Sequence, residues 1–130
     1  MKILVIDDDH MVRYTLSKIL RNSGYEVVTA ADGERGMTAF HAEKPDVVIT
    51  DLIMPEQEGI ETILQIKRAR PEVRIIAISG GGRIANTDVL QAARGLGADE
   101  ILAKPFEAEE LLSRLGHADP FGAAIRRAAS

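Results

Sequence analysis

The stretch ILVIDDDHM, residues 3–11, ends a short apolar run in three consecutive aspartates. A run of this length, rich in β-branched residues, predicts a buried β-strand. Packed carboxylates repel one another and are costly to desolvate, so Asp7 and Asp8 at the end of a buried strand need a compensating partner, most often a cation. Asp9 stands where the N-cap of a following helix would lie. The stretch therefore predicts a strand, a cation site and a helix start in succession.

We expect the first apolar run, KILVI, to form a strand over residues 2–6. Four more runs resemble it. They are EVVTA at 26–30, DVVIT at 46–50, VRIIAIS at 73–79 and EILA at 100–103. The segments between them carry apolar residues at helical spacing, and Asp9 and Asp32 stand where helix N-caps would lie. Strands that are apolar on both faces and alternate with helices imply a parallel sheet covered on each side and joined by right-handed crossovers. The predicted fold class is α/β, a doubly wound sheet of five parallel strands.

Composition narrows the function classes. A chain of 130 residues with 45% hydrophobic residues is the size of one domain with a real core. A net charge of −4 argues against a reader of phosphate backbones, so we expect no direct nucleic-acid binding by this domain. Cysteine is absent, the first apolar run is too short for a signal sequence, and no stretch could span a membrane. We therefore expect no membrane partner and a cytoplasmic location.

Polar side chains follow four of the five predicted strands. In sheets of this class, ligands bind beyond the carboxyl ends of the strands. The residues predicted there are Asp7 and Asp8, Asp51, Ser79 and Lys104. Carboxylates, a hydroxyl and an ammonium at one edge indicate a hard-cation site beside an anion site, and Mg²⁺ with a phosphoryl group fits best.

Each residue of this set also has a simpler interpretation. Asp51 could be a turn residue, Ser79 could bond to the backbone, and Lys104 could be a solvated charge. Their agreement on one sheet edge outweighs the separate interpretations.

These motifs resemble those of the receiver domain of two-component response regulators, from Lys2 to about Leu115. The resemblance is carried by the acidic pair, by DLIMP at 51–55, by ISG at 78–80 and by KPF at 104–106. It implies a flavodoxin-like fold with strand order 2-1-3-4-5.

The resemblance also implies a role for each site residue. Asp51 would accept a phosphoryl group from a histidine of a sensor kinase or a phosphotransfer protein, since an ionised carboxylate needs no general base. Mg²⁺ would be held by Asp8, Asp51, the backbone carbonyl of Ile53 and, by way of water, Asp7.

The remaining implied contacts involve the phosphoryl oxygens and the partners. Lys104 would pair with one phosphoryl oxygen, and Ser79 would donate a hydrogen bond to another. Such a domain phosphorylates and dephosphorylates itself rather than turning over a substrate, and it switches partner binding through the face of the fourth and fifth strands. Its output would pass to a downstream protein or a fused effector domain.

The sequence departs from the family pattern in two places. Ile101 stands where many members carry an aromatic residue three positions before the lysine. The segment between Ser79 and Lys104 looks longer than usual and contains GGGR at 80–83. Three glycines predict either a loop that orders on switching or a simple flexible connector.

Two rival functions remain open at this point. Asp7 and Asp9 mimic the D-x-D pair of a metal-dependent phosphatase of the haloacid dehalogenase type, but we find neither the later acidic pair nor the cap insertion that such an enzyme needs. A flavin or nucleotide carrier is disfavoured because the first loop lacks phosphate-cradling glycines or hydroxyls.

The domain boundary is predicted near Gly116, which suits a helix C-cap, with Pro120 preventing a simple continuation. We therefore expect the receiver domain over residues 1–116 and a tail or linker over residues 117–130. The tail is too short for an effector domain, so the protein either acts alone by docking or is a receiver cut from a longer regulator.

Overall fold

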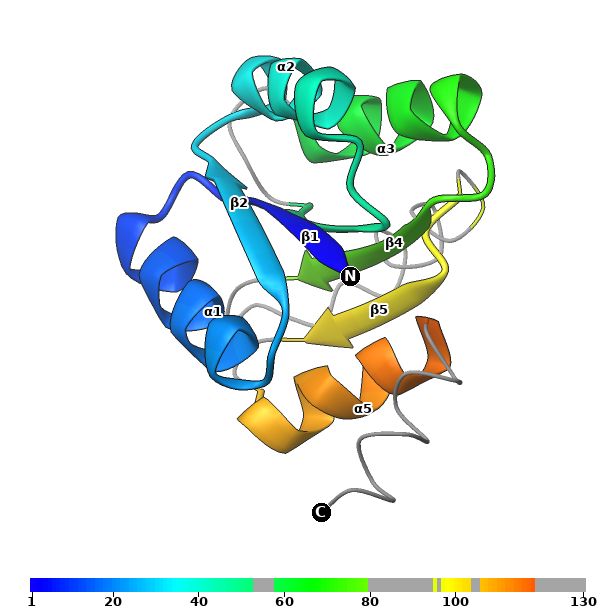
Figure 1. The fold of residues 1–130 in the computed structure, drawn as a ribbon. Coiled ribbons are helices and arrows are strands. Elements are labelled where there is room, and N and C mark those ends of the chain that lie inside the picture. Colours follow the sequence, from blue (N-terminus) through cyan, green and yellow to red (C-terminus); the bar gives the residue numbers. More distant parts are fainter. Residues whose placement is uncertain (53–57, 80–94, 96, 104–105, 119–130) are drawn as a thin grey trace.

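A computed structural model of the chain describes residues 1–52, 58–79, 95, 97–103 and 106–118, and its strands form one parallel five-stranded sheet in the order β2-β1-β3-β4-β5 (Figure 1). This confirms the predicted class and strand order. The strands are β1 Lys2–Ile6, β2 Glu26–Ala30, β3 Val47–Asp51, β4 Arg74–Ser79 and β5 Glu100–Ala103. The described helices are α1 His10–Asn22, α2 Gly33–Glu43, α3 Glu58–Ala69 and α5 Ala108–Ala118. Two predicted strands, those expected at 46 and 73, begin one residue later than expected.

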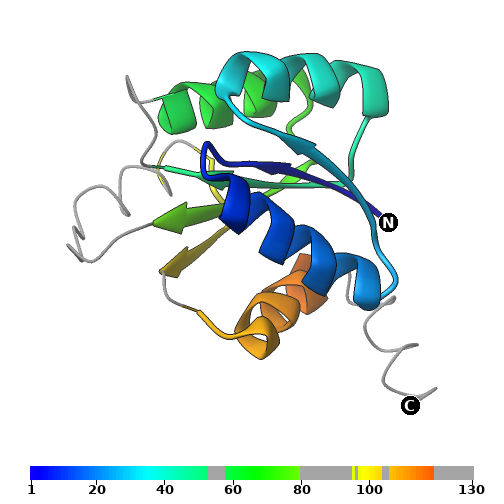
Figure 2. The ribbon, with the colours of Figure 1, turned by 90° about the vertical axis from the view of Figure 1, so that its left-hand side faces the viewer.

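The sheet lies between two helical layers. Figures 1 and 2 show α2 and α3 on one face and α1 and α5 on the other. In β1, Ile3 and Val5 join the core under α1 and α5, whereas Leu4 and Ile6 join the core under α2 and α3. All four side chains are fully buried. Because helices cover both faces of the sheet, residues 3–6 are apolar on both faces of the strand.

Most helix ends lie where local residues predict them. A carboxylate oxygen of Asp9 accepts a hydrogen bond from the Met11 amide at 2.9 Å, and Asp32 accepts one from the Arg35 amide at 2.7 Å. Both aspartates are therefore N-caps, as predicted. At the other end of α2, Lys44 adopts a left-handed conformation with φ 49°.

The predicted C-cap at Gly116 is wrong, because α5 continues to Ala118. A glycine C-cap requires a positive φ, and Gly116 is not among the described glycines with positive φ, which are Gly24 and Gly97. Leu111 and Leu115 are fully buried and hold the preceding turns of α5 against the sheet. The low helix propensity of one glycine, a cost of about 1 kcal/mol relative to alanine, does not end the helix at this position.

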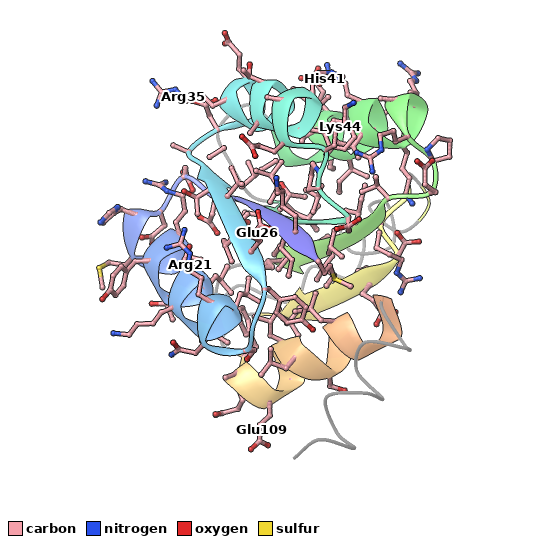
Figure 3. The ribbon with its side chains drawn as sticks, viewed as in Figure 1. Arg21, Glu26, Arg35, His41, Lys44 and Glu109 are labelled. Atoms are coloured by element: carbon pink, nitrogen blue, oxygen red, sulfur yellow. The ribbon has the colours of Figure 1, made fainter. Side chains whose placement is uncertain are left out.

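Many charged side chains lie on the outside of the molecule, as the labelled residues of Figure 3 illustrate for α1, β2, α2 and α5. Lys2 ties strand β1 to two of its neighbours, with its ammonium 3.0 Å from Glu43 and 3.6 Å from Glu26. The hydrogen bond to Glu43 raises the pKa of the Lys2 ammonium. In the part of the chain that the structure describes, no helix is long and apolar enough to cross a membrane.

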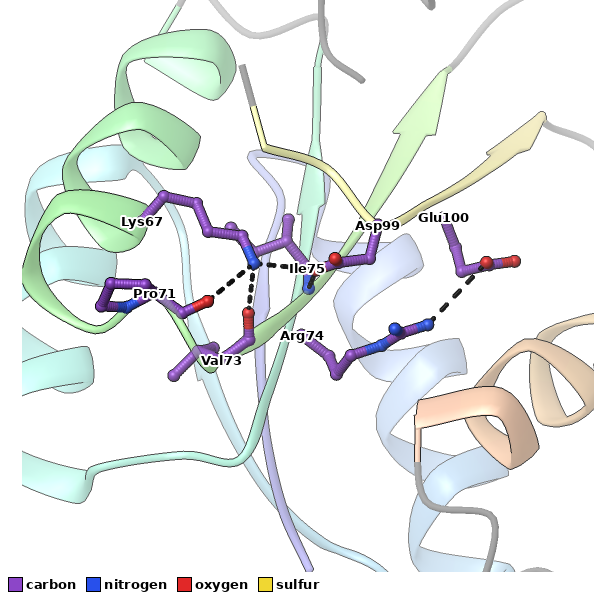
Figure 4. A network of polar contacts seen from close by, with 7 residues as sticks. All are labelled: Lys67, Pro71, Val73, Arg74, Ile75, Asp99 and Glu100. Atoms are coloured by element: carbon purple, nitrogen blue, oxygen red, sulfur yellow. Dashed lines mark hydrogen bonds and ion pairs between the residues drawn. The ribbon is translucent and has the colours of Figure 1, made fainter. Parts of the chain in front are cut away.

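A polar network fixes the C-terminal end of α3 (Figure 4). The Lys67 ammonium donates to the carbonyl oxygens of Val73 at 2.8 Å and Pro71 at 3.2 Å, and it lies 3.0 Å from Oδ2 of Asp99. The same Asp99 oxygen accepts a hydrogen bond from the Ile75 amide at 2.9 Å. One ammonium therefore joins α3 to the turn before β4 and to the turn before β5.

Replacing Lys67 tests how much this network contributes to the free energy of unfolding. Lys67→Met keeps the apolar stem but removes the donor shared by three acceptors, so the free energy of unfolding should fall by about 1–2 kcal/mol after allowance for solvent screening. The exposed Lys18, whose ammonium lies 5.7 Å from the Tyr14 ring centroid, is the control. Lys18→Met should cost about 0.5 kcal/mol or less. Urea unfolding measures the free energy of unfolding of both variants. Equal losses of stability in Lys67→Met and Lys18→Met would contradict the proposed contribution of the network.

Candidate functional site

Three carboxylates meet at the carboxyl edge of the sheet. Asp7 and Asp8 follow β1, and Asp51 is the last residue of β3. One ligand atom of each lies within 4.8 Å of the others. We call these three residues the acidic cluster. The sequence predicted that these residues would lie together, and the described structure brings them together.

The register of the sheet explains this proximity. Strands β1 and β3 are parallel neighbours, with Ile6 opposite Thr50. The next residues along the two strands, Asp7 and Asp51, therefore leave the sheet side by side. Asp8, one residue further, completes the cluster.

Burial differs within the acidic cluster. Asp7 is 1% exposed and Asp51 is 4% exposed, whereas Asp8 is an exposed residue. Carboxylates in such close proximity disfavour one another's charge, and burial adds to this cost. Three carboxylate groups at the rim of the fold form a ligand set suited to a hard divalent cation, which prefers oxygen ligands.

Hydrogen bonds hold Asp7 in place from both sides. Its amide donates to the Ala30 carbonyl at 3.1 Å, which extends the pairing of β1 with β2. Its Oδ1 accepts a hydrogen bond from the Asp9 amide at 2.9 Å, and its carbonyl accepts one from the Arg13 guanidinium at 2.7 Å. Asp9 itself caps α1 and is not part of the acidic cluster. The three successive aspartates thus have different environments, as predicted.

The backbone around Asp51 is held by β4 and α3. Asp51 lies opposite Ile78, and the Leu52 amide donates to the Ile78 carbonyl at 2.8 Å. On the other side lies Gly59, in the first turn of α3. A methyl group at Gly59 would overlap the carbonyl oxygen of Asp51 and come within 2.8 Å of the Leu52 Cα.

Sequence reasoning missed Gly59. The available signal was a glycine inside a helical pattern, which is tolerated at a cost and often has a packing reason. Only the tertiary structure shows that the reason is close approach to the end of β3.

The other predicted site residues are only partly described. Ser79 ends β4 opposite Ala103 in β5, so its backbone lies at the expected edge of the sheet. Lys104, which follows Ala103 in the chain, lies outside the described residues together with Pro105 and Ile53.

The two departures from the family pattern have different outcomes. Ile101 lies in β5 opposite Ala77 and is half-buried. The glycine segment 80–83 lies outside the described residues.

A cavity of about 430 Å³ lies between α2 and α3. Its lining includes Glu34 and His41 of α2 and Glu61 of α3, but no member of the acidic cluster. Within the described residues, only the acidic cluster forms a group of three or more side chains placed to hold a metal ion. It is therefore the candidate functional site.

Comparison with known proteins agrees with this site. A family model described as the response regulator receiver domain matches residues 3–116. The chain is 39% identical over 114 residues to the probable transcriptional regulator ycf27 of Guillardia theta, with 88% of this chain and 43% of that protein covered. It is 36% identical over 116 residues to the response regulator MprA of Mycolicibacterium vanbaalenii, with 88% and 48% covered. The chain thus spans about half the length of the curated relatives it matches.

Comparison with solved structures indicates the same family. A receiver domain protein from Clostridium thermocellum superposes with a TM-score of 0.84 at 32% identity, covering 95% of this chain and 98% of that one. A CheY-like receiver domain protein from Methanospirillum hungatei gives a TM-score of 0.82 at 28% identity, covering 89% and 90%. These comparisons do not support the haloacid dehalogenase alternative. With its fold, its acidic cluster and these relatives in agreement, the chain belongs to the response regulator receiver domain family of two-component systems.

Proposed function

We propose that this receiver domain accepts a phosphoryl group on Asp51. The observation that carries the proposal is the meeting of Asp51 with Asp7 and Asp8 at the carboxyl edge of the sheet, with ligand atoms within 4.8 Å. Asp51 is the central acceptor candidate because it ends β3, the middle strand of the sheet.

The reaction is a transfer from a phosphohistidine. A carboxylate oxygen of Asp51 attacks the phosphorus and forms a P–O bond. The P–N bond breaks, and its electron pair returns to the imidazole nitrogen of the donor. An ionised aspartate is a competent nucleophile at neutral pH, so the main obstacle is repulsion between the acidic cluster and the incoming phosphate.

The residues that would hold Mg²⁺ are Asp8, Asp51, the backbone carbonyl of Ile53 and, through water, Asp7. The all-oxygen acidic cluster supports this assignment, since Mg²⁺ takes oxygen ligands and commonly keeps several waters. When bound, the cation neutralises charge between the nucleophile and the phosphoryl oxygens.

Two further side chains are proposed to contact the phosphoryl group. Lys104 pairs with one phosphoryl oxygen, and Ser79 donates a hydrogen bond to another. The sheet order supports both roles, because β4 and β5 follow β3 in space and these residues follow or end those strands.

The proposed phosphodonor is a sensor histidine kinase or a phosphotransfer protein. We propose that the output passes to a downstream protein or to a fused effector domain, because the curated relatives include transcriptional regulators about twice the matched length. In this assignment the receiver domain comprises residues 1–116, and residues 117–130 form a tail or linker.

Asp51→Asn tests the acceptor. The asparagine amide keeps the shape of the side chain but cannot form an acyl phosphate, so incubation with a small acyl-phosphate donor and Mg²⁺ should give no added phosphate by intact-mass spectrometry. Asp32→Asn is the matched control, because asparagine is as good an N-cap as aspartate. The control should be labelled like the parent. Labelling of Asp51→Asn at the parental level would refute the acceptor assignment.

Asp8→Ala tests the cation site by thermal unfolding. A ligand that binds only the folded state stabilises it by about 2.7 kcal/mol at a hundredfold excess over Kd, so Mg²⁺ should raise the melting temperature of the parent. Asp8→Ala should lose most of this gain. Without metal the variant should melt no lower than the parent, because one of three mutually repelling charges is gone.

Glu109→Ala, at an exposed acidic residue in the first turn of α5, is the control for Asp8→Ala. It should keep the full response to Mg²⁺. If Asp8→Ala gains as much from Mg²⁺ as the parent does, the cation binds elsewhere.

A further inference from the structure

We infer that Gly59 is a positioning residue for the phosphoryl acceptor. In the structure, the first turn of α3 lies so close to the end of β3 that only a residue without a side chain fits at this position. The inference rests on the proposed function of Asp51 and extends it to a residue that touches neither metal nor phosphate.

The contact at Gly59 is with backbone rather than with a side chain. A Cβ atom there would overlap the Asp51 carbonyl oxygen and would lie 2.8 Å from the Leu52 Cα and 3.0 Å from the Leu52 carbonyl oxygen. A side-chain neighbour could rotate away, but a peptide group can only be displaced as a unit. A methyl group at residue 59 must therefore move either α3 or the Asp51–Leu52 peptide.

Movement of α3 is opposed at its other end and along its length. The Lys67 ammonium is bonded to Val73 and Pro71 in the turn before β4 and to Asp99 in the turn before β5. The Lys67 stem is itself confined, because a Cβ at Gly97 would lie 2.5 Å from its Cγ.

The middle of α3 is equally constrained. Ile63 and Ile66 are fully buried in the core beneath α2 and α3. Interiors are close-packed and yield little to translation of a helix. The displacement therefore falls largely on the Asp51–Leu52 peptide.

Displacement of that peptide reaches the reaction site directly. It shifts the backbone that carries the Asp51 carboxylate relative to Asp7, which is bonded to Ala30, Asp9 and Arg13. Misplacement of such groups typically costs about 10- to 100-fold in metal affinity or activity.

Gly36 provides a matched control. It is also a helical glycine in tight contact, because a Cβ there would lie 2.5 Å from Cδ1 and 2.9 Å from Cγ1 of Ile6. The nearest neighbours there are side-chain atoms of Ile6, however, so the added methyl group meets no peptide group of the acidic cluster. Gly36→Ala thus introduces the same methyl group into the same core without pressing on the acceptor backbone.

The experiment compares the parent, Gly59→Ala and Gly36→Ala. We measure the Mg²⁺ dissociation constant by calorimetry, the initial rate of labelling by a small acyl-phosphate donor at saturating Mg²⁺, and the melting temperature without metal. Gly59→Ala should weaken Mg²⁺ binding and slow labelling by about tenfold or more. Gly36→Ala should change both by less than about twofold, whatever its effect on melting.

A double variant separates positioning from simple destabilisation. Lys67→Met releases the far end of α3, so the helix can move away from the methyl group in Gly59→Ala/Lys67→Met. The double variant should be less stable than either single variant, yet it should recover part of the Mg²⁺ affinity and labelling rate lost in Gly59→Ala. A purely structural role for Gly59 predicts the opposite, a further loss of both.

The outcomes also separate this inference from the proposed function. If the parent itself is not labelled on Asp51, the proposed function fails. If the parent is labelled and binds Mg²⁺, but Gly59→Ala matches Gly36→Ala in both quantities, the positioning role of Gly59 is refuted and the acceptor assignment stands.

Discussion

The pairing of β1 with β3 is the contact on which the rest of this structure depends. With Ile6 opposite Thr50, the chain leaves the two strands at Asp7 and Asp51, and two buried carboxylates lie side by side. A slip of one residue in this register would turn the side chains of one strand to the opposite face and separate the pair. The fully buried apolar side chains on both faces of β1 and β3 oppose such a slip.

The helices then hold Asp7 and the Asp51 backbone from two different directions. On the side of β1, the Asp9 amide and the Arg13 guanidinium bond to Asp7, so the start of α1 and the end of β1 form one unit. On the side of β3, α3 presses Gly59 against the Asp51–Leu52 peptide. Carboxylates that repel one another are thus held together by packing and hydrogen bonds elsewhere. A cation would find its ligands already close together.

Helix α3 connects the two ends of the sheet. Its first turn contacts the Asp51–Leu52 backbone, Ile63 and Ile66 in its middle are buried, and its last turn is anchored through Lys67. Asp99, the partner of Lys67, directly precedes β5. A helix held at both ends and buried along its middle is a rigid part of this fold.

Much of this molecule could be read from local sequence. The alternation of β-branched runs and helical spacing predicted the α/β class, and every predicted strand lies within one residue of its observed start and end. The two aspartate N-caps were predictable because capping involves only neighbouring residues. The succession of Asp7 and Asp8 indicated a cation site, and the motifs around Asp51, Ser79 and Lys104 indicated the family that the comparisons show.

Tertiary structure decided what depends on contacts between distant segments. The sequence alone placed a helix end at Gly116, but α5 continues to Ala118. It gave no reason for Gly59, because the close approach of α3 to the end of β3 arises only when helix and sheet pack together. Local preferences act within a few residues along the chain and are worth about 1 kcal/mol each. The mutual approach of strands and helices is set by the packing of a whole core, so it follows from the fold and not from any single motif.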